Sequence, residues 1–285
     1  MSEIKLSLKN INFTYGEGTP FEIKALKDVS LDIKSGIMTG IIGHTGSGKS
    51  TLVQMLNGLL KPTSGQVLLD GKDIWENPKE ISKVRYQVGL VMQYPEYQLF
   101  EETVRKDIAF APTNMGLSAE EIEERVLEAA EFAGVDGSLL DKSPFDLSGG
   151  QKRRVAIAGI MAMRPDVLVL DEPAAGLDPR GKNLILSGIR EYQRKTGAAV
   201  VLVSHSMEDM AKYCDEIIVM ANAGLVMQGS CDEVFSRSSS LTDIGLDVPQ
   251  ITKLLMYIKA KGIDVSDSVY TVDDAYSEII KLFQQ

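Results

Sequence analysis

The residues with the clearest chemical role form one short segment, in which glycines and small polar residues lead up to a lysine. The segment fits the pattern G-x-x-x-x-G-K-[ST], a loop whose backbone N–H groups surround phosphate oxygens. The lysine adds a positive charge toward the β- and γ-phosphates, and the Ser50 hydroxyl is suited to bind Mg²⁺. The pattern therefore predicts a nucleotide-binding loop made of Gly43, His44, Thr45, Gly46, Ser47, Gly48, Lys49, Ser50 and Thr51.

Such a loop binds phosphate when it joins a strand to a helix, and the flanking sequence predicts both. Residues 37–42 are mostly apolar, which is typical of a short buried strand. After the loop, Leu52, Leu56 and Leu59 recur at helical spacing until Pro62 ends the run. The predicted helix would direct the positive end of its dipole at the bound anion.

Polar residues also follow three other predicted strands. Gln93 follows residues 88–92, Asp171 and Glu172 follow the aliphatic run 167–170, and His205 follows 199–203. In open α/β sheets, ligands gather at the carboxyl ends of the strands. There Asp171 would bind Mg²⁺, Glu172 would orient an attacking water, and Gln93 would reach the metal or that water. Alone, Gln93 would be read as a loop glutamine and His205 as a core histidine, but together these residues favour nucleotide hydrolysis.

Between residues 94 and 165 the pattern is helical. Ser118 and Glu121 have the spacing of a capping box, and Gly134 is suited to end the helix that follows. A second helix follows residues 147–151, where Ser148 would cap the helix and Gly149 and Gly150 would let an anion approach the backbone, ahead of Gln151. We expect the basic residues 152–154 to lie on the solvated face of that helix.

The two ends of the chain allow more than one interpretation. The first 35 residues alternate as strands do, and Tyr15 ends the first of them, so that its ring could stack on adenine or could be a core-edge aromatic. At the other end, the serine-rich run 236–240 is typical of a linker, and two amphipathic helices follow it. We therefore predict a domain over residues 1–235 and a helical appendage over 236–285, which makes a dimer contact or caps the core.

The composition is that of an ordinary globular protein and does not favour nucleic-acid binding. The 285 residues carry a net charge of −10, which argues against an electrostatic nucleic-acid surface. The two cysteines lack metal-ligand spacing, and we expect them to be reduced thiols of a cytosolic protein. No signal-peptide run begins the chain, and no run approaches the ~18 apolar residues of a membrane span. Any membrane role would therefore be peripheral and would act through a partner.

The order of these motifs resembles that of the ATP-binding cassette (ABC) ATPases over residues 4–235. The chain has a Walker A loop (43–51), a glutamine loop (Gln93), the signature LSGGQ (147–151), a Walker B strand (167–172), a D-loop (176–179) and a switch histidine (His205). The resemblance implies a P-loop α/β fold with a mainly parallel sheet, an antiparallel N-terminal β subdomain and a helical subdomain at about 94–165. It also implies that two subunits pair head to tail, with ATP and Mg²⁺ between the Walker A loop of one and the signature of the other. Tyr15 would then stack on adenine, and Asp178 of the D-loop would belong to the nucleotide site.

A closer resemblance is to the ATPase subunits of energy-coupling factor (ECF) importers of vitamins and metal ions. It is carried by residues 93–100, 103–104 and 107–110, by 43–46 and by 171–178, and it favours the second of the two paired ATPases. Ala174 departs from the threonine or serine frequent at that place in ABC sequences. The resemblance implies a paralogous ATPase as partner, a transmembrane coupling subunit that docks on the segment after Gln93, a substrate-binding membrane subunit beyond it, and a place on the cytoplasmic face of the membrane.

Three other functions are less compatible with the sequence. A P-loop GTPase or kinase would leave LSGGQ unexplained, and the guanine motif N-K-x-D is missing. An ABC ATPase acting on DNA or ribosomes would carry a coiled-coil insertion, zinc cysteines or a second cassette. A soluble ABC ATPase of an assembly machine, such as iron–sulfur cluster assembly, remains the alternative. The sequence does not identify the solute, the choice between self and paralogue, or the equivalence of two ATP sites.

Overall fold

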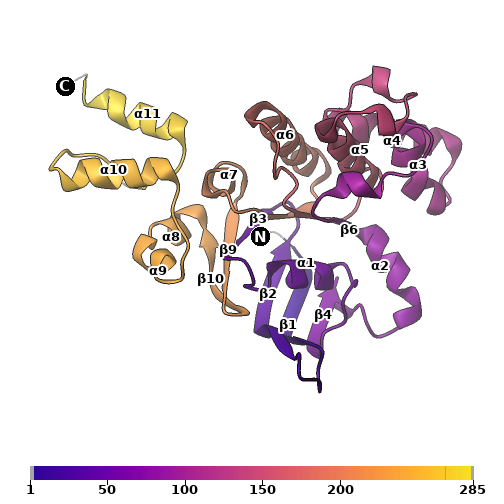
Figure 1. Cartoon of the computed structure of the whole chain (residues 1–285), viewed down its shortest axis with the longest axis horizontal. Coiled ribbons are helices and arrows are strands. Elements are labelled where there is room, and N and C mark those ends of the chain that lie inside the picture. The colour runs from indigo at the N-terminus through magenta and orange to yellow at the C-terminus, as the bar shows by residue number, and fades with distance from the viewer. Residues whose placement is uncertain (1–2, 267, 284–285) are drawn as a thin grey trace.

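Two β-sheets form the centre of the molecule (Figure 1). The computed structural model describes residues 3–266 and 268–283, and within them the first sheet is antiparallel in the order β2-β1-β4-β5. The residues expected to alternate as strands pair with one another, Leu6 opposite Ile33 and Leu8 opposite Leu31. Met1 and Ser2, at the start of the segment without a signal-peptide run, lie outside the described residues. The strands are β1 (Ile4–Tyr15), β2 (Ile23–Lys34), β4 (Ser64–Leu69) and β5 (Lys72–Asp73).

The second sheet is mainly parallel and holds the predicted strand ends on one edge. Its order in the described residues is β10-β9-β3-β8-β7-β6, with only β10 antiparallel to its neighbour. Every residue of β3, β7 and β8 is buried, as the continuous apolar runs predicted. The strands are β3 (Met38–Ile42), β6 (Val88–Val91), β7 (Val167–Asp171), β8 (Ala199–Val203), β9 (Glu216–Ala221) and β10 (Gly224–Ser230).

Helices lie around the second sheet and form the two ends of the molecule. The predicted helical subdomain is at the upper right of Figure 1, and the last two helices are at its upper left. The helices are α1 (Lys49–Leu56), α2 (Ile81–Gln87), α3 (Val104–Asn114), α4 (Ala119–Ala133), α5 (Gly149–Met161), α6 (Pro179–Thr196), α7 (Met207–Tyr213), α8 (Cys231–Phe235), α9 (Ser238–Asp243), α10 (Gln250–Ala260) and α11 (Val272–Lys281). Short 3-10 helices are η1 (Pro78–Glu80), η2 (Pro95–Gln98), η3 (Gly137–Leu139) and η4 (Pro144–Asp146).

The predicted helix starts in the helical subdomain are confirmed. Ser118 accepts a hydrogen bond from Glu121 N while the Glu121 carboxylate accepts one from Ser118 N, so both halves of the capping box form. Gly134 ends α4 at φ 68°, a left-handed conformation that glycine adopts without strain. Ser148 caps α5 in the same way through Gln151, so the helix begins at Gly149, three residues earlier than the charged run suggested.

The expectation that residues 152–154 form a solvated face is wrong for Arg153. Its side chain is 5% exposed, and it forms an ion pair with Glu96 of η2. Three consecutive residues on a helix point in directions about 100° apart, so one of them can face the interior while its neighbours remain outside. Sequence spacing could not reveal this, because the carboxylate that compensates the buried charge is 57 residues away.

The serine-rich run expected to be a linker instead contains the start of a helix. Ser238, Ser239 and Ser240 open α9, whose Leu241 is fully buried in the main core next to the second sheet. A separate small core joins α10 to α11 through Leu255, Val265 and Ala275. The division of the chain at residues 235 and 236 stays a prediction. Among the described residues, no helix is long and apolar enough to cross a membrane.

An ion pair fixes α6 to the edge of the second sheet that lies opposite the predicted site. Both guanidinium nitrogens of Arg190 contact the Asp215 carboxylate at 2.6 and 2.7 Å. The same carboxylate accepts a hydrogen bond of 2.8 Å from Met38 N, at the start of β3. Burial alone would raise the pKa of Asp215, but the hydrogen bonds from Arg190 and Met38 and the arginine charge hold it below its usual range.

We expect Asp215→Asn to destabilise the protein by about 1–2 kcal/mol at pH 7, because it removes a charged acceptor from two donors. A depressed carboxyl pKa stabilises the fold above the unfolded-state value of 3.8, and that contribution is lost as the pH falls through the folded-state pKa. The difference between wild type and variant should therefore shrink at pH 3. Denaturant unfolding at both pH values measures it, and a constant difference would contradict the assignment.

Candidate functional site

A cavity of about 490 Å³ lies at the carboxyl ends of β3, β6, β7 and β8, and β1 and β2 complete it. We call it the P-loop cavity. It brings together eleven of the residues singled out from the sequence, which come from segments far apart in the chain. It is lined by Tyr15, Ile23, Lys24, Ala25, Thr45, Gly46, Gly48, Lys49, Ser50, Thr51, Gln93, Asp171, Glu172 and His205.

The glycine-rich loop is shaped by close backbone contacts. Gly48 precedes α1 at φ 102°, and a Cβ there would come within 2.5 Å of the Ala25 carbonyl oxygen. Gly43 is equally confined, because a Cβ would lie 2.4 Å from the Met220 carbonyl oxygen. Lys49 donates to the carbonyl oxygens of Gly43 and His44 at 2.6 and 3.0 Å, across the loop. Gly43, His44 and Ser47 thus shape the loop but do not line the cavity.

Two of the three predicted Mg²⁺ ligands, Ser50 and Asp171, are neighbours in the cavity. Ser50 at the start of α1 hydrogen-bonds to the Asp171 carboxylate at the end of β7. Burial raises the pKa of Asp171, while the Ser50 bond and the charge of Lys49 act in the opposite direction. A hydroxyl and a carboxylate are the hard oxygen ligands that Mg²⁺ takes, and this ion keeps waters and phosphate oxygens for its remaining positions. The donor set therefore fits Mg²⁺.

Glu172 has the strongest electrostatic perturbation at the cavity. Burial of its carboxyl and the adjacent Asp171 charge raise the pKa of Glu172 to about 7. Its Oε1 lies 3.2 Å from His205 Nε2 but is buried without a hydrogen-bond partner among the described residues. The backbone is left-handed at φ 53°, which is costly for a residue with a Cβ and typical of functional positions. A carboxylate with an unused oxygen and a pKa near neutrality is suited to accept a proton from water.

His205 lies on the rim of the cavity, after the end of β8, as its position in the sequence predicted. Its side chain is 59% exposed, so it is not a core histidine. Burial of its inner side and the nearby Lys49 lower the pKa of His205, while Asp171 raises it. The lowered pKa keeps the imidazole neutral at pH 7, so that one ring nitrogen can donate a hydrogen bond and the other can accept one.

Gln93 reaches the same cavity from β6. The residue after it, Tyr94, has a left-handed backbone at φ 56° and starts η2, so the chain turns sharply at this point. The carboxamide of Gln93 thus lines the P-loop cavity, whereas residues 94–98 run along the helical subdomain.

Tyr15 lies at the open mouth of the cavity, 41% exposed, and its hydroxyl is 3.2 Å from Thr51 Oγ1. Ile23 on β2 is its cross-strand partner and lines the same wall, with Lys24 and Ala25 beside it. These three residues were not predicted from the sequence. The hairpin that joins β1 to β2 could have indicated them, because it places the start of β2 beside Tyr15.

The signature residues lie outside the cavity. Ser148 and Gly149 are exposed at the N-terminus of α5, and none of Ser148, Gly149, Gly150 and Gln151 lines the cavity. Asp178 also lies elsewhere, and its carboxylate accepts from Gly181 N at 2.8 Å as the cap of α6. The exposed start of α5 and the phosphate loop of one chain therefore do not line a common cavity.

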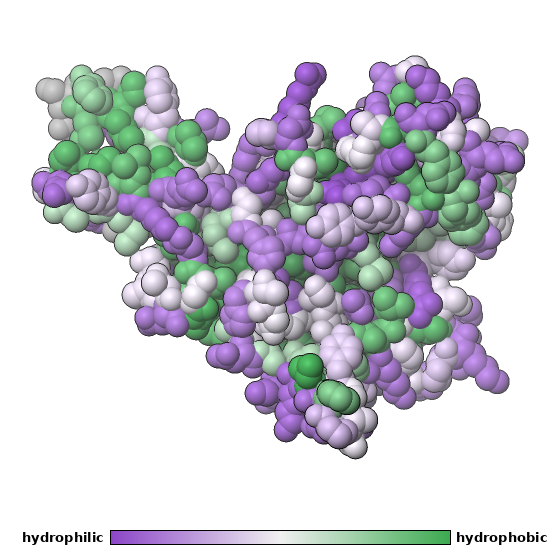
Figure 2. Space-filling model, in the orientation of Figure 1, coloured by the Kyte–Doolittle hydropathy of each residue, from purple (hydrophilic) through white to green (hydrophobic). Residues whose placement is uncertain are grey.

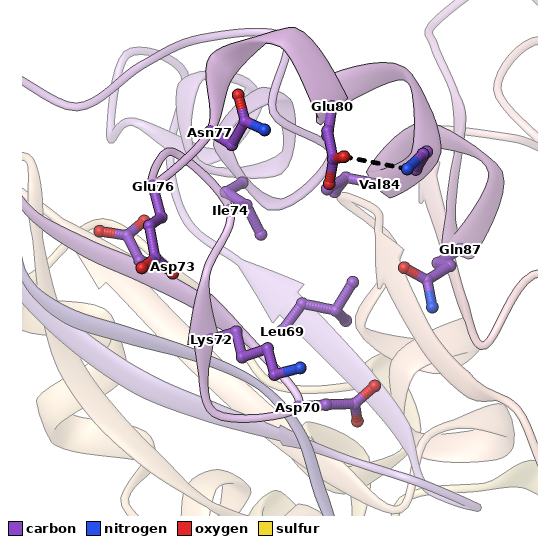
Figure 3. A pocket seen from close by; sticks show the side chains of 11 residues that line it. Leu69, Asp70, Lys72, Asp73, Ile74, Glu76, Asn77, Glu80, Val84 and Gln87 are labelled. Atoms are coloured by element: carbon purple, nitrogen blue, oxygen red, sulfur yellow. Dashed lines mark hydrogen bonds and ion pairs between the residues drawn. The ribbon is translucent and has the colours of Figure 1, made fainter.

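A second hollow of about 490 Å³ shares no residue with the P-loop cavity. Figure 3 shows it between α2 and the turn from β4 to β5. Its carboxylates come from Asp70, Asp73, Glu76 and Glu80, and Glu80 is paired with Lys83 at 3.0 Å. None of the predicted site residues lies there.

Comparison with known proteins points in the same direction. A family model described as ABC transporter matches residues 26–175. The energy-coupling factor transporter ATP-binding protein EcfA2 of Caldanaerobacter subterraneus is 53% identical over 97% of this chain and 96% of its own length. The protein of the same name from Clostridium acetobutylicum is 51% identical over 98% of each chain.

Among solved structures, cbiO1 of Clostridium perfringens, described as part of the ABC transporter complex cbiONQ, matches with a TM-score of 0.75 and 40% identity. The match covers 85% of this chain and 94% of that one. The dimeric ABC transporter cassette MJ0796 in a post-hydrolysis state with ADP and Pi matches with a TM-score of 0.71 and 30% identity, over 79% of this chain and 98% of that one.

We expect Tyr15→Ala to weaken ATP binding by roughly 5- to 100-fold, because aromatic stacking on a base contributes about 1–3 kcal/mol. Tyr15→Phe keeps the ring and loses only the contact with Thr51, so its affinity should stay within about threefold of wild type. Calorimetric titration with ATP measures both variants. Equal affinity of Tyr15→Ala and wild type would assign the ring to the core edge.

Proposed function

The chain belongs to the ABC transporter family, and within it to the ATP-binding subunits of energy-coupling factor transporters, and we propose that its P-loop cavity hydrolyses ATP to power an importer of vitamins or transition-metal ions. The observation that carries the proposal is the convergence of Lys49, Ser50, Asp171, Glu172 and His205 in one cavity. Relatives matched over nearly their full length carry transporter names, so the soluble assembly ATPase is not favoured.

In the proposed mechanism the phosphate loop binds the ATP phosphates, and side chains at the strand ends carry out the hydrolysis. The backbone N–H groups of residues 43–51 and the Lys49 ammonium hold the phosphates. Ser50, Asp171 and Gln93 would hold Mg²⁺, whose positive charge would stabilise the negative phosphate oxygens when the ion is bound. Glu172 accepts a proton from the attacking water through its unpaired Oε1. His205 lies next to Glu172 and is neutral, so that its single N–H donates to the γ-phosphate.

The place of the signature supports a head-to-tail pair of ATPase subunits. Ser148, Gly149 and Gly150 lie at the start of α5, where the Ser148 N–H is hydrogen-bonded to Gln151 and the two glycines supply the next backbone N–H groups, and none of the three lines the P-loop cavity of its own chain. We propose that they close on the nucleotide held by a second ATPase subunit, a paralogue rather than a copy, and that Asp178 reaches that interface. The ATP-binding cassette MJ0796, to which this chain is similar, is itself dimeric, which supports a pair.

A groove next to the segment after Gln93, residues 94–110, which we call the docking segment, supports a membrane partner. It has a volume of about 370 Å³ between α2 and the helical subdomain, and its apolar floor includes Leu59, Tyr86, Met92 and Met163. Beside it, Tyr97 and Phe100 are 85% and 57% exposed, an uncommon density of aromatic rings in water. We propose that a transmembrane coupling subunit docks here and links the chain to a substrate-binding membrane subunit, which places the chain peripherally on the cytoplasmic face of the membrane.

Glu172→Gln should lower the rate of ATP hydrolysis by at least about 100-fold and leave ATP affinity within about threefold, because it removes the proton acceptor but keeps the shape. Glu120→Gln, an exposed change of the same kind on α4, serves as control and should not alter hydrolysis. Steady-state phosphate release by the assembled transporter measures both. Hydrolysis by Glu172→Gln at the wild-type rate would exclude Glu172 as the base.

Tyr97→Ser should reduce the amount of membrane subunit that co-purifies with the chain by at least about threefold, because it removes an apolar ring from the proposed docking surface. Phe21→Ser provides a matched control, since Phe21 is 84% exposed in the loop between β1 and β2, away from the groove. Quantitative mass spectrometry of the purified complexes gives the ratio. Equal loss in both variants would show that the effect is not specific to the groove.

A further inference from the structure

Arg153 is a buried cation that joins its own helix to two other segments of the chain. On α5, two residues after the signature, its guanidinium donates to Glu96 Oε2 at 2.9 Å and to Glu96 Oε1 at 2.6 Å. A third hydrogen bond goes to the carbonyl oxygen of Ala175. The guanidinium carbon also lies 5.6 Å from the centre of the Tyr94 ring. The guanidinium group thus donates from all three of its nitrogens and also lies near an aromatic ring.

Each segment that Arg153 contacts carries a predicted functional motif. Glu96 lies three residues after Gln93, at the start of the docking segment. Ala175 lies three residues after Glu172 and three before Asp178, between the Walker B strand and the D-loop. Leu177 in the same loop lies near Gly150, since a Cβ on that glycine would be 3.4 Å from Leu177 Cδ2. Arg153 therefore joins the signature helix to the segment after the glutamine loop and to the residue that precedes the D-loop.

The pairing is tight because both charges are removed from water. The side chains of Arg153 and Glu96 are 5% and 15% exposed. Burial would raise the pKa of Glu96, but the hydrogen bonds and the charge of Arg153 lower it, so the carboxylate stays ionised at neutral pH. By contrast, Arg105 pairs with the exposed carboxylates of Glu123 and Asp141 at the surface, where such pairs contribute little. A bidentate buried pair holds its two segments in one orientation.

We propose that Arg153 is a positioning residue that fastens the docking segment, the signature helix and the D-loop into one rigid unit. The proposal rests on the proposed function, in which a membrane subunit docks on the segment after Gln93. A displacement of that segment then moves the exposed end of α5 and the loop that leads to Asp178 together. While the contacts of Arg153 hold, the docking segment cannot shift independently of the surface that faces the second ATPase.

The test compares four forms of the complete transporter. Arg153→Met removes the fork and leaves Glu96 buried without its partner, which can impair folding. The double variant Arg153→Met/Glu96→Leu replaces both charges by apolar groups of similar size, a change that buried ion pairs often tolerate. Arg153→Lys keeps the charge but cannot make the bidentate contact. Arg190→Met is the matched control, because it breaks a bidentate pair with Asp215 that lies away from the motifs.

We expect the double variant to keep its melting temperature and its ratio of co-purified membrane subunits and to hydrolyse ATP in the complex about tenfold more slowly. The Michaelis constant for ATP should change less than twofold, because Arg153 does not line the P-loop cavity. Arg153→Lys should fall in between. Arg190→Met should lower the melting temperature without changing the turnover rate. Wild-type turnover in the double variant would overturn the proposal.

Hydrogen exchange of the isolated chain gives a readout that does not require a membrane partner. In the double variant the amides of residues 94–98 and 175–178 should exchange at least about fivefold faster, with the rest of the chain unchanged. Unchanged exchange in both segments would also overturn the proposal. If wild-type turnover does not respond to the membrane subunits at all, the proposed function fails, and the exchange result still decides the role of Arg153.

Discussion

The compensation of buried charges around Lys49 is the interaction on which the rest of the site depends. Lys49 is a buried residue, and burial lowers the pKa of its ammonium, while the charges of Glu172 and Asp171 raise it. Each of these groups would be costly to bury alone, and together they are tolerated. The cation comes from the chain after β3 and the carboxylates from the end of β7. In the sheet, β8 lies between these strands and pairs with both, Val201 with Thr39 and with Val169. The register of one central strand therefore sets the distance between opposite charges.

The residue that follows β7, Glu172, is strained, and β8 anchors its backbone. Glu172 adopts a left-handed backbone that costs roughly 1–2 kcal/mol for a residue with a side chain. Its N–H donates to the Val203 carbonyl oxygen at 3.0 Å, the last bond of the ladder with β8. The turn that follows points the carboxylate into the cavity instead of across the sheet. Tyr94 makes a comparable turn after β6. The backbone therefore turns sharply away after two of the strands, and it does not cover the side chains at those strand ends.

Local patterns predicted most of the fold and the residues that gather in the cavity. The apolar runs before Gly43, Gln93, Asp171 and His205 are buried strands, because a strand covered on both faces needs apolar side chains throughout. Parallel strands put their carboxyl ends on one edge, so proximity followed from topology. Signature and D-loop were assigned to a nucleotide by resemblance, and their roles stay predictions.

What the sequence could not predict depends on contacts between distant segments. A basic run at a helix start is usually solvated, and nothing within a few residues of Arg153 indicates that Glu96 compensates its charge. The serines of α9 are poor helix formers, and the helix exists because Leu241 is buried in the core. The appendage shows the same limit. Its periodic apolar residues predicted two helices, but Tyr276 and Val272 remain 67% and 69% exposed. Figure 2 shows hydrophobic residues at the surface in the region of α10 and α11.

The capping box at the signature has a consequence for how fast two subunits can recognise each other. Gln151 uses its carboxamide oxygen to accept from Ser148 N at 2.9 Å, while Ser148 Oγ accepts from Gln151 N. The glycine amides between them are thus already ordered in the single chain. A surface that is ordered before contact loses little conformational entropy on association. Formation of the pair is then limited by diffusional encounter and orientation rather than by the folding of a loop.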